Sequence, residues 1–266
     1  MALASCLGRL ATRPGQFEVS RQEVAFAGRP LDATYVRPAF PRTAGALIVF
    51  FTGDAGWLGA SGEVFEHLAE SGHFVAGYNS REALKPIKKS GEWVSTLDMA
   101  EQLEEVFSAA RRDLGLPETT PVIVVGVSRG ASAVAFAAVQ PRLQQRLAGA
   151  IAIALTRESD YLRQDGSRDG DKPLEVDAQG RILLYPAVRK RAAIPLAVIQ
   201  SAGDSYVPAA ESRDLLGPDT ATLRLYEVDA RNHGFSGGRD ALIDDLDDAL
   251  AWIERSAAGT SRAGSP

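Results

Sequence analysis

Short apolar stretches alternate along this chain with longer stretches whose apolar residues recur every three or four positions. Residues 17–27 and 31–36 alternate between apolar and polar side chains, which is typical of strands buried on one face. Residues 46–51 are apolar without interruption, as expected of a strand covered on both faces, and we expect similar strands in the mainly apolar stretches at 74–78, 122–125, 148–155, 196–200 and 223–228. Helical stretches follow at residues 61–71, 93–114, 130–140, 208–216 and 239–254. This order predicts an α/β domain with a mostly parallel central sheet and helices on both faces.

Three segments do not fit the alternation. Residues 156–192 are rich in Asp and Gly and have little periodicity, so we expect an insertion before the strand at 196–200 that covers the substrate pocket like a lid. Residues 257–266 are rich in Ser, Ala and Gly, which predicts a disordered tail. Residues 1–16 form an N-terminal segment, and we therefore expect a single domain over residues 17–256.

The composition narrows the class of protein. The 266 residues include 29 Lys and Arg against 34 Asp and Glu, for a net charge of −5. A nucleic-acid-binding protein usually carries a basic surface, so this charge argues against that class. Cys6 is the only cysteine, which excludes an intrachain disulfide and a cysteine-rich zinc site. No apolar stretch approaches the roughly 18 residues that span a bilayer, so we expect a soluble or peripheral protein.

Residues 3–6, Leu-Ala-Ser-Cys, match the short motif that precedes a lipidated cysteine in bacterial lipoproteins. Only five residues precede Cys6, fewer than the basic and apolar parts of a signal need. Two interpretations stay open. Either the match is chance, and we expect a cytoplasmic protein, or residues 1–16 are the remnant of a lipoprotein signal, and the protein is periplasmic or tethered to a membrane.

Residues 126–130, Gly-Val-Ser-Arg-Gly, are the strongest chemical signal in the chain. They directly follow the apolar strand at 122–125 and precede a helix of small residues, which is the strand–turn–helix setting of a nucleophile elbow. A side chain at either glycine would collide with the sheet or with the following helix. Ser128 is therefore the expected nucleophile.

A serine hydroxyl needs a base to take its proton, and the chain offers three histidines. We expect His67 and His73 to be structural, because the first lies within an apolar-patterned helix and the second opens a strand. His233 follows the last strand, at the sheet edge toward which the elbow projects, so it is the candidate base. Asp204 follows the preceding strand and is the candidate acid that orients this histidine.

A tetrahedral oxyanion needs two N–H donors, and we expect the first from Arg129, the residue after the nucleophile. The second donor should come from the loop after the strand at 46–51, where Asp54 and Ala55 are the candidates. The side chain of Asp54 has two open interpretations: it caps a helix or pairs with a cation such as Arg129, or it receives a cationic group of the substrate. Trp57, in the same loop, is a further candidate for substrate binding.

Weaker signals concern ions, cofactors and membranes. Residues 85–89 and 189–191 form basic clusters that are either solvated faces or a peripheral contact with anionic lipid. Residues 165–171 resemble the opening of a calcium loop, but its twelfth position is Val176 instead of glutamate, so we expect no metal. No nucleotide-binding motif occurs, so no cofactor is implied. The oligomeric state leaves no signal in the sequence.

The chain order Ser128, Asp204, His233, together with residues 124–131 and 232–235, resembles the α/β-hydrolase superfamily over nearly the whole chain. The resemblance implies the α/β-hydrolase fold and a Ser-His-Asp triad that cleaves a carboxylic ester through an acyl-enzyme.

Within this superfamily, residues 50–57, Phe-Phe-Thr-Gly-Asp-Ala-Gly-Trp, are similar to the Ser-Gly-Asp-Gly-Gly-Trp signature of the VirJ/AcvB bacterial virulence-protein family. Residues 68–77 also fit that family's helix–strand step. The resemblance implies a periplasmic enzyme that hydrolyses aminoacylated phosphatidylglycerol, whose cationic aminoacyl group would meet Asp54. Arg129 stands where the family usually has an aromatic residue, and Gly234 where it usually has a second histidine.

Two alternatives remain at this point. Residues 233–235, His-Gly-Phe, are also similar to dienelactone-hydrolase-like enzymes, which favour small soluble esters or lactones. The chain could also be a binding or secretion-associated protein that keeps the fold without catalysis, although such a role does not require an intact serine, aspartate and histidine.

Overall fold

A computed structural model describes residues 16–26, 28–40, 45–84, 92–164 and 173–263 of the chain. Three features predicted above lie outside the described residues: the cysteine motif at residues 3–6, the basic cluster at 85–89 and the calcium-like loop at 165–171. Within the described residues, no helix is long and apolar enough to cross a membrane.

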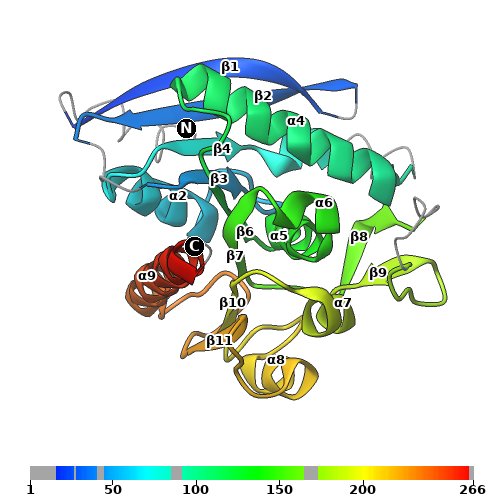
Figure 1. Cartoon of the computed structure of the whole chain (residues 1–266). Helices are drawn as coiled ribbons and strands as arrows, with labels where there is room; N and C mark the ends of the chain where they lie inside the picture. Colours follow the sequence, from blue (N-terminus) through cyan, green and yellow to red (C-terminus); the bar gives the residue numbers. More distant parts are fainter. Residues whose placement is uncertain (1–15, 27, 41–44, 85–91, 165–172, 264–266) are drawn as a thin grey trace.

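An eight-stranded sheet forms the centre of the molecule (Figure 1). Its first two strands pair in antiparallel fashion, the second pairs antiparallel with β4, and the remaining strands are parallel. The strands lie side by side in the order β1 (Phe17–Phe26), β2 (Arg29–Pro38), β4 (Val75–Tyr78), β3 (Leu47–Phe51), β6 (Val122–Val127), β7 (Leu147–Ile153), β10 (Leu196–Ser201) and β11 (Leu223–Val228). The predicted mostly parallel sheet is confirmed.

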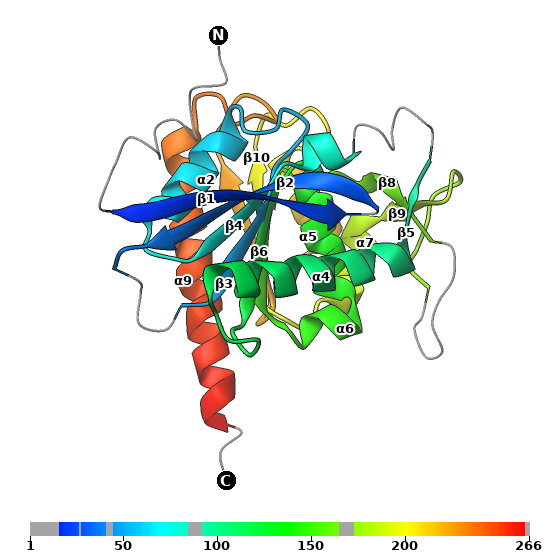
Figure 2. The ribbon, with the colours of Figure 1, turned by 90° about the horizontal axis from the view of Figure 1, so that it is seen from above.

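Helices cover both faces of this sheet, and the alternation of side chains along each strand builds a separate core on each side (Figure 2). Ile48 and Phe50 of β3 belong to the core beneath α2 (Ala60–Glu70) and α9 (Arg239–Ala263). Leu47, Val49 and Phe51 of the same strand belong to the opposite core. The helices over that second core are α4 (Thr96–Leu114), α5 (Arg129–Val139), α6 (Pro141–Gln144), α7 (Leu184–Arg191) and α8 (Ala209–Leu216).

The segment 156–192 contains regular structure that its composition does not predict. Residues 158–163 and 181–183 form the strands β8 (Glu158–Arg163) and β9 (Arg181–Leu183), and α7 follows directly. With β5 (Val94–Ser95) these strands make a second, three-stranded sheet in which β8 is central. Strands this short are held by pairing with a distant partner and leave no periodic pattern of their own, which is why the sequence does not predict them. That this insertion covers the substrate pocket stays a prediction.

The basic cluster at 189–191 lies at the end of α7. Lys190 forms an ion pair with Glu175, and Arg191 donates a hydrogen bond to the carbonyl of Pro173. Part of this charge is therefore used within the protein, and a contact with anionic lipid stays a prediction.

The last helix extends farther than the sequence predicts. α9 runs to Ala263 instead of ending near residue 255, so residues 257–263 belong to a helix and are not a disordered tail. Once a helix has formed, each further residue adds a hydrogen bond at little cost, and the alanines of this segment favour it.

The two histidines predicted to be structural both join the α2 region to α9. The Nε2 atom of His67 lies 2.7 Å from Asp247, and that of His73 lies 3.0 Å from Glu254. The other ring nitrogen of His73 is 2.7 Å from the hydroxyl of Ser71. These contacts attach the last helix to α2 on the face of the sheet opposite α5.

Replacing Leu246, which is fully buried on the inner face of α9, tests this packing. We expect Leu246→Ala to lower the free energy of unfolding by about 2–5 kcal/mol, because it removes buried methyl groups and leaves a cavity. Asp244→Ala, on the exposed face of the same helix, should change it by less than about 0.5 kcal/mol. Chemical denaturation measures both values, and equal losses would contradict the packing described.

Candidate active site

Ser128 stands at the turn between β6 and α5 in a backbone conformation that residues with side chains rarely adopt. Its φ is 55° and its ψ is −112°. Such a conformation costs about 1–3 kcal/mol and persists only where the surroundings hold it. Here the N–H of Ser128 donates to the carbonyl of Ile153 at the end of β7, at 2.8 Å. The turn therefore lifts the serine side chain out of the sheet, as the elbow motif predicts.

The two glycines of the motif let α5 approach the sheet very closely. A Cβ atom at Gly126 would lie 2.4 Å from the carbonyl of Gly130, and one at Gly130 would lie 2.2 Å from the carbonyl oxygen of Phe51. Real Cβ atoms do not approach backbone atoms to such distances. The helix that follows Ser128 consequently packs against both β6 and β3, and the space between them admits no side chain.

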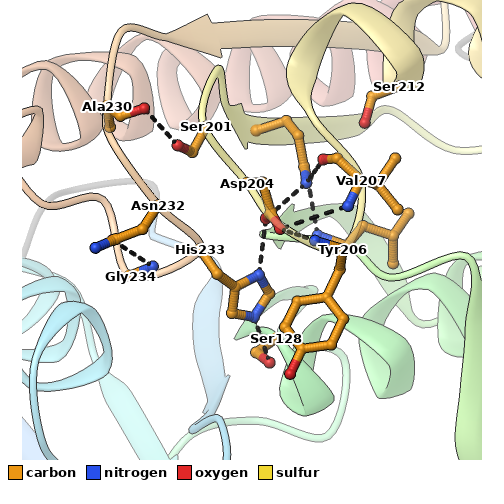
Figure 3. A network of polar contacts seen from close by, with 12 residues as sticks. Ser128, Ser201, Asp204, Tyr206, Val207, Ser212, Ala230, Asn232, His233 and Gly234 are labelled. Carbon is orange, nitrogen blue, oxygen red and sulfur yellow. Dashed lines mark hydrogen bonds and ion pairs between the residues drawn. The ribbon is translucent and has the colours of Figure 1, made fainter.

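Ser128, His233 and Asp204 form one continuous hydrogen-bonded series (Figure 3). The His233 Nδ1 atom lies 2.7 Å from Asp204 Oδ2, and its Nε2 atom lies 2.8 Å from Ser128 Oγ. An ionised carboxylate can only accept, so the proton of a neutral imidazole belongs on Nδ1. This tautomer leaves Nε2 free to accept the hydroxyl proton of Ser128, which is the arrangement that a general base requires.

The carboxylate of Asp204 is fully buried yet well supplied with donors. Its side chain has 0% relative exposure. Oδ1 accepts from the backbone N–H groups of Tyr206 at 2.8 Å and Val207 at 3.4 Å, and Oδ2 accepts from the side-chain amide of Gln200 at 3.0 Å as well as from His233. Hydrogen bonds to the charged form compensate a buried carboxylate for lost hydration.

The loop that carries His233 is built around the side chain of Asn232. Its Oδ1 atom accepts from the backbone N–H groups of Gly234 at 3.0 Å and Ser236 at 3.2 Å. Phe235 adopts a φ of 57° and is fully buried. This folded loop fixes the position of the histidine backbone at the carboxyl end of β11.

The candidate oxyanion donors lie around Ser128. Arg129 is the first residue of α5, where a backbone N–H has no acceptor within the helix. Gly53 passes so close to the nucleophile that a Cβ atom on it would lie 3.1 Å from that of Ser128. Asp54 and Ala55 follow directly and are exposed in a tight turn. The N–H of Gly56 closes this turn by donating to the carbonyl of Gly53 at 3.0 Å. The loop therefore runs beside the nucleophile, and the assignment of the second donor stays a prediction.

The side chain of Arg129 joins two acidic residues from different parts of the fold. One terminal nitrogen pairs with Asp54 at 2.6 Å, and Nε and the other terminal nitrogen bind Asp160 of β8. Burial lowers the pKa of Arg129, but the hydrogen bonds and charge of Asp160 and the charge of Asp54 outweigh it and raise the pKa above its ordinary value. Of the two interpretations of Asp54, the ion pair with Arg129 is observed.

Two aromatic residues near the site differ in their surroundings. Trp57 packs with its ring on Phe65, with centroids 4.8 Å apart, and on Phe50, so it contributes to the core and its substrate contact stays a prediction. Tyr206 is 62% exposed, and its ring meets that of His233 edge-on at 4.8 Å (Figure 3). Tyr206 thus covers one side of the histidine from solvent.

Two of these neighbours were not foreseen from the sequence. Asp160 lies in a segment without periodicity, so nothing marks it as a partner of Arg129. Gln200 had a usable signal, because it is the only polar residue in the apolar stretch at 196–200. Among the residues that the structure describes, no group of His, Cys, Asp and Glu side chains is arranged to hold a metal ion.

The close approach of α5 can be tested at Gly130. We expect Gly130→Ala to lower the free energy of unfolding by about 1–3 kcal/mol or more, because the added carbon overlaps the backbone of Phe51. The control is Gly234→Ala, whose Cβ would meet its nearest atom at 3.4 Å. Thermal or chemical denaturation of both variants measures the difference, and equal stability would argue against the tight contact.

Comparison with models of protein families gives no match, and comparison with curated protein sequences gives none either. Solved structures do match. A Klebsiella pneumoniae protein assigned as a dienelactone hydrolase is 17% identical, with a TM-score of 0.62 over 89% of this chain and 98% of that one. The esterase Est1E from Butyrivibrio proteoclasticus is 13% identical, with a TM-score of 0.59 over 88% and 98%.

A Pyrococcus horikoshii acylaminoacyl peptidase is 18% identical, with a TM-score of 0.61 over 94% of this chain. The match spans 43% of the peptidase, less than half of its length. Identities this low bear on the fold, and the resemblance to VirJ and AcvB stays a prediction. The sheet order, the helices on both faces and these likenesses agree on one conclusion: the chain has the α/β-hydrolase fold.

Proposed function

We propose that the protein is a serine hydrolase that cleaves a carboxylic ester through an acyl-enzyme. The observation that carries the proposal is the hydrogen-bonded series from Asp204 through His233 to Ser128, with the serine raised on a strained turn. The fold shared with an esterase and with a protein assigned as a dienelactone hydrolase supports it.

Each member of the series has a defined part in the reaction. Ser128 Oγ attacks the ester carbonyl carbon while its proton passes to His233 Nε2. The imidazolium then gives this proton to the departing alkoxide, which leaves as the alcohol. A water molecule, deprotonated by the same nitrogen, attacks the acyl-enzyme, and the serine recovers its proton as the acid departs. Asp204 holds the ring and stabilises the imidazolium in both steps.

The oxyanion of each tetrahedral intermediate would form beside the N–H of Arg129 and that of Asp54 or Ala55. Backbone donors that are held in place before the reaction stabilise the developing charge without reorganising. The turn closed by Gly53 and Gly56 supports this placement, because its backbone runs beside Ser128.

For the substrate, we favour an ester that carries a cationic group, such as an aminoacyl phospholipid. The side chains of Asp54 and Asp160 bring two negative charges to the single positive charge of Arg129, so this cluster is negative by one. The Asp54 side chain is 56% exposed and lies next to the nucleophile, where it can meet an ammonium group. A small neutral ester or lactone is the alternative, which the likeness to the dienelactone hydrolase supports.

Labelling with a fluorophosphonate tests the proposed chemistry. We expect the wild type to be labelled, and Ser128→Ala and His233→Ala to lose labelling and ester hydrolysis by about 10³-fold or more, because nucleophile and base act as one unit. Ser132→Ala is the matched control, since this buried serine lies one turn farther along α5, and its labelling should persist. A folded wild type that remains unlabelled would contradict the proposal and favour the binding-protein alternative.

The preference for a cationic ester can be measured on a matched pair of nitrophenyl esters, one with an ammonium group and one neutral. We expect Asp54→Asn to lower kcat/KM for the cationic ester by about two- to fivefold, the effect of one exposed ion pair, and to spare the neutral ester. Asp160→Asn removes the other negative charge of the cluster, and we expect it to lower kcat/KM for the cationic ester less than Asp54→Asn does, because Asp160 binds the far side of Arg129. If Asp54→Asn affects both esters equally, the carboxylate does not select the substrate.

A further inference from the structure

We propose that Gln200 is the residue that positions the acid of the triad, and that it does so with a side-chain amide whose orientation the fold determines. The inference rests on the proposed function of the site, because it assigns a role within that site. Gln200 lies near the end of β10, four residues before Asp204, and is fully buried.

The side chain of Gln200 satisfies three partners at once. Its Oε1 atom accepts from the backbone N–H of Leu155 at 3.0 Å. Its Nε2 atom donates to Asp204 Oδ2 at 3.0 Å and to the backbone carbonyl of Val207. An N–H group can bind only the oxygen of the amide, and a carbonyl can bind only the nitrogen. The two backbone partners therefore determine which end of the amide faces Asp204, and that end is a donor.

This donor decides which carboxylate oxygen is presented to the histidine. Asp204 Oδ1 is occupied by the N–H groups of Tyr206 and Val207, and Oδ2 receives both Gln200 and His233. Because Oδ2 accepts from Gln200 as well as from His233, a carboxylate that turned away from Nδ1 would also lose its hydrogen bond to the amide. No Lys or Arg pairs with Asp204 among the ion pairs of the described residues, so neutral donors hold its charge.

Gln200 also joins the acid to the end of β7, whose backbone accepts the N–H of the nucleophile. Leu155 follows Ala154, which has a φ of 55°. The N–H of Ala154 donates to the carbonyl of Ile199 in the neighbouring strand β10. The carbonyl of Ile153 in turn accepts the N–H of Ser128. The phenol of Tyr185 donates to the carbonyl of Leu155, which holds this backbone from its other side. Gln200 and Ser128 are thus both hydrogen-bonded to the backbone at the end of β7, which fixes their positions relative to each other.

The decisive variant is Gln200→Glu, which keeps the size of the side chain and an acceptor for the N–H of Leu155. The donor to Asp204 becomes a second carboxyl group, and two buried carboxyl groups in contact share a proton that leaves only at raised pH. We expect kcat/KM to stay near the wild-type value while this proton is present, and to fall at least about tenfold as rising pH removes it. The wild type should lack this alkaline decrease.

Gln200→Met tests the hydrogen bond apart from the shape of the side chain, because methionine has a similar length and no donor for Asp204. It removes the donor at every pH, so we expect kcat/KM to fall about tenfold at all pH values, with the loss in kcat and not in KM. Ser201→Ala is the matched control: Ser201 is the next residue of β10, is equally buried, and its hydroxyl donates to the carbonyl of Ala230 at 3.0 Å. Its contact with the triad comes from its backbone carbonyl, which accepts the N–H of Asp204 and which the substitution keeps. Its pH profile should match the wild type.

A measurement that does not depend on activity distinguishes failure of this inference from failure of the proposed function. The nitrogen chemical shifts of the His233 ring, measured by NMR, report which ring nitrogen carries the proton. The signals of this ring are identified by their absence from the spectrum of His233→Ala. We expect the Nδ1–H form in the wild type and in Ser201→Ala, and a mixture of the two forms in Gln200→Met. This result would support the positioning role even in a wild type that fluorophosphonate does not label. Wild-type ring shifts and pH profiles in both Gln200 variants would overturn it.

Discussion

The site depends on the distance between α5 and β3. The helix comes so close to the strand that the carbonyl of Phe51 occupies the place where a side chain of Gly130 would be. The chain can enter this helix from β6 only through a sharp turn, and the residue at the turn, Ser128, must take a positive φ. The strain at the serine is thus a consequence of the packing of the whole domain, and it keeps Oγ pointing away from the sheet toward the imidazole ring.

The parallel pairing of the central strands brings the remaining groups to the same edge. Phe51, at the end of β3, is level with Gly126 of β6, which is level with Ala152 of β7. The loops after β3, β10 and β11 therefore begin near the turn of the nucleophile. Each loop supplies one kind of group: backbone beside the serine, a buried carboxylate, and the histidine. In parallel sheets with helices on both faces, this edge is where sites are usually found.

The parts of this arrangement that were predictable are those encoded locally. The long apolar stretches marked the strands, and the serine motif, together with the order of the aspartate and histidine, marked where three loops would meet. The small sheet was not predictable, because Val94 of β5 pairs with Leu162 of β8 across a long separation and neither strand has a period of its own. Asp160 was missed for the same reason. The helix at residues 257–263 was missed because composition alone does not show that a preceding helix continues.

The two groups of charges at the site differ in their exposure to mobile ions. The charge of Asp204 is enclosed by neutral donors and has no contact with solvent, so dissolved salt has little access to it. The carboxylates of Asp54 and Asp160 are partly exposed to solvent, where counterions screen them over a Debye length of about 8 Å at physiological ionic strength. Ionic strength therefore acts on the two groups separately: the environment of the protein can weaken its attraction for charged molecules while the geometry of the reacting groups stays intact.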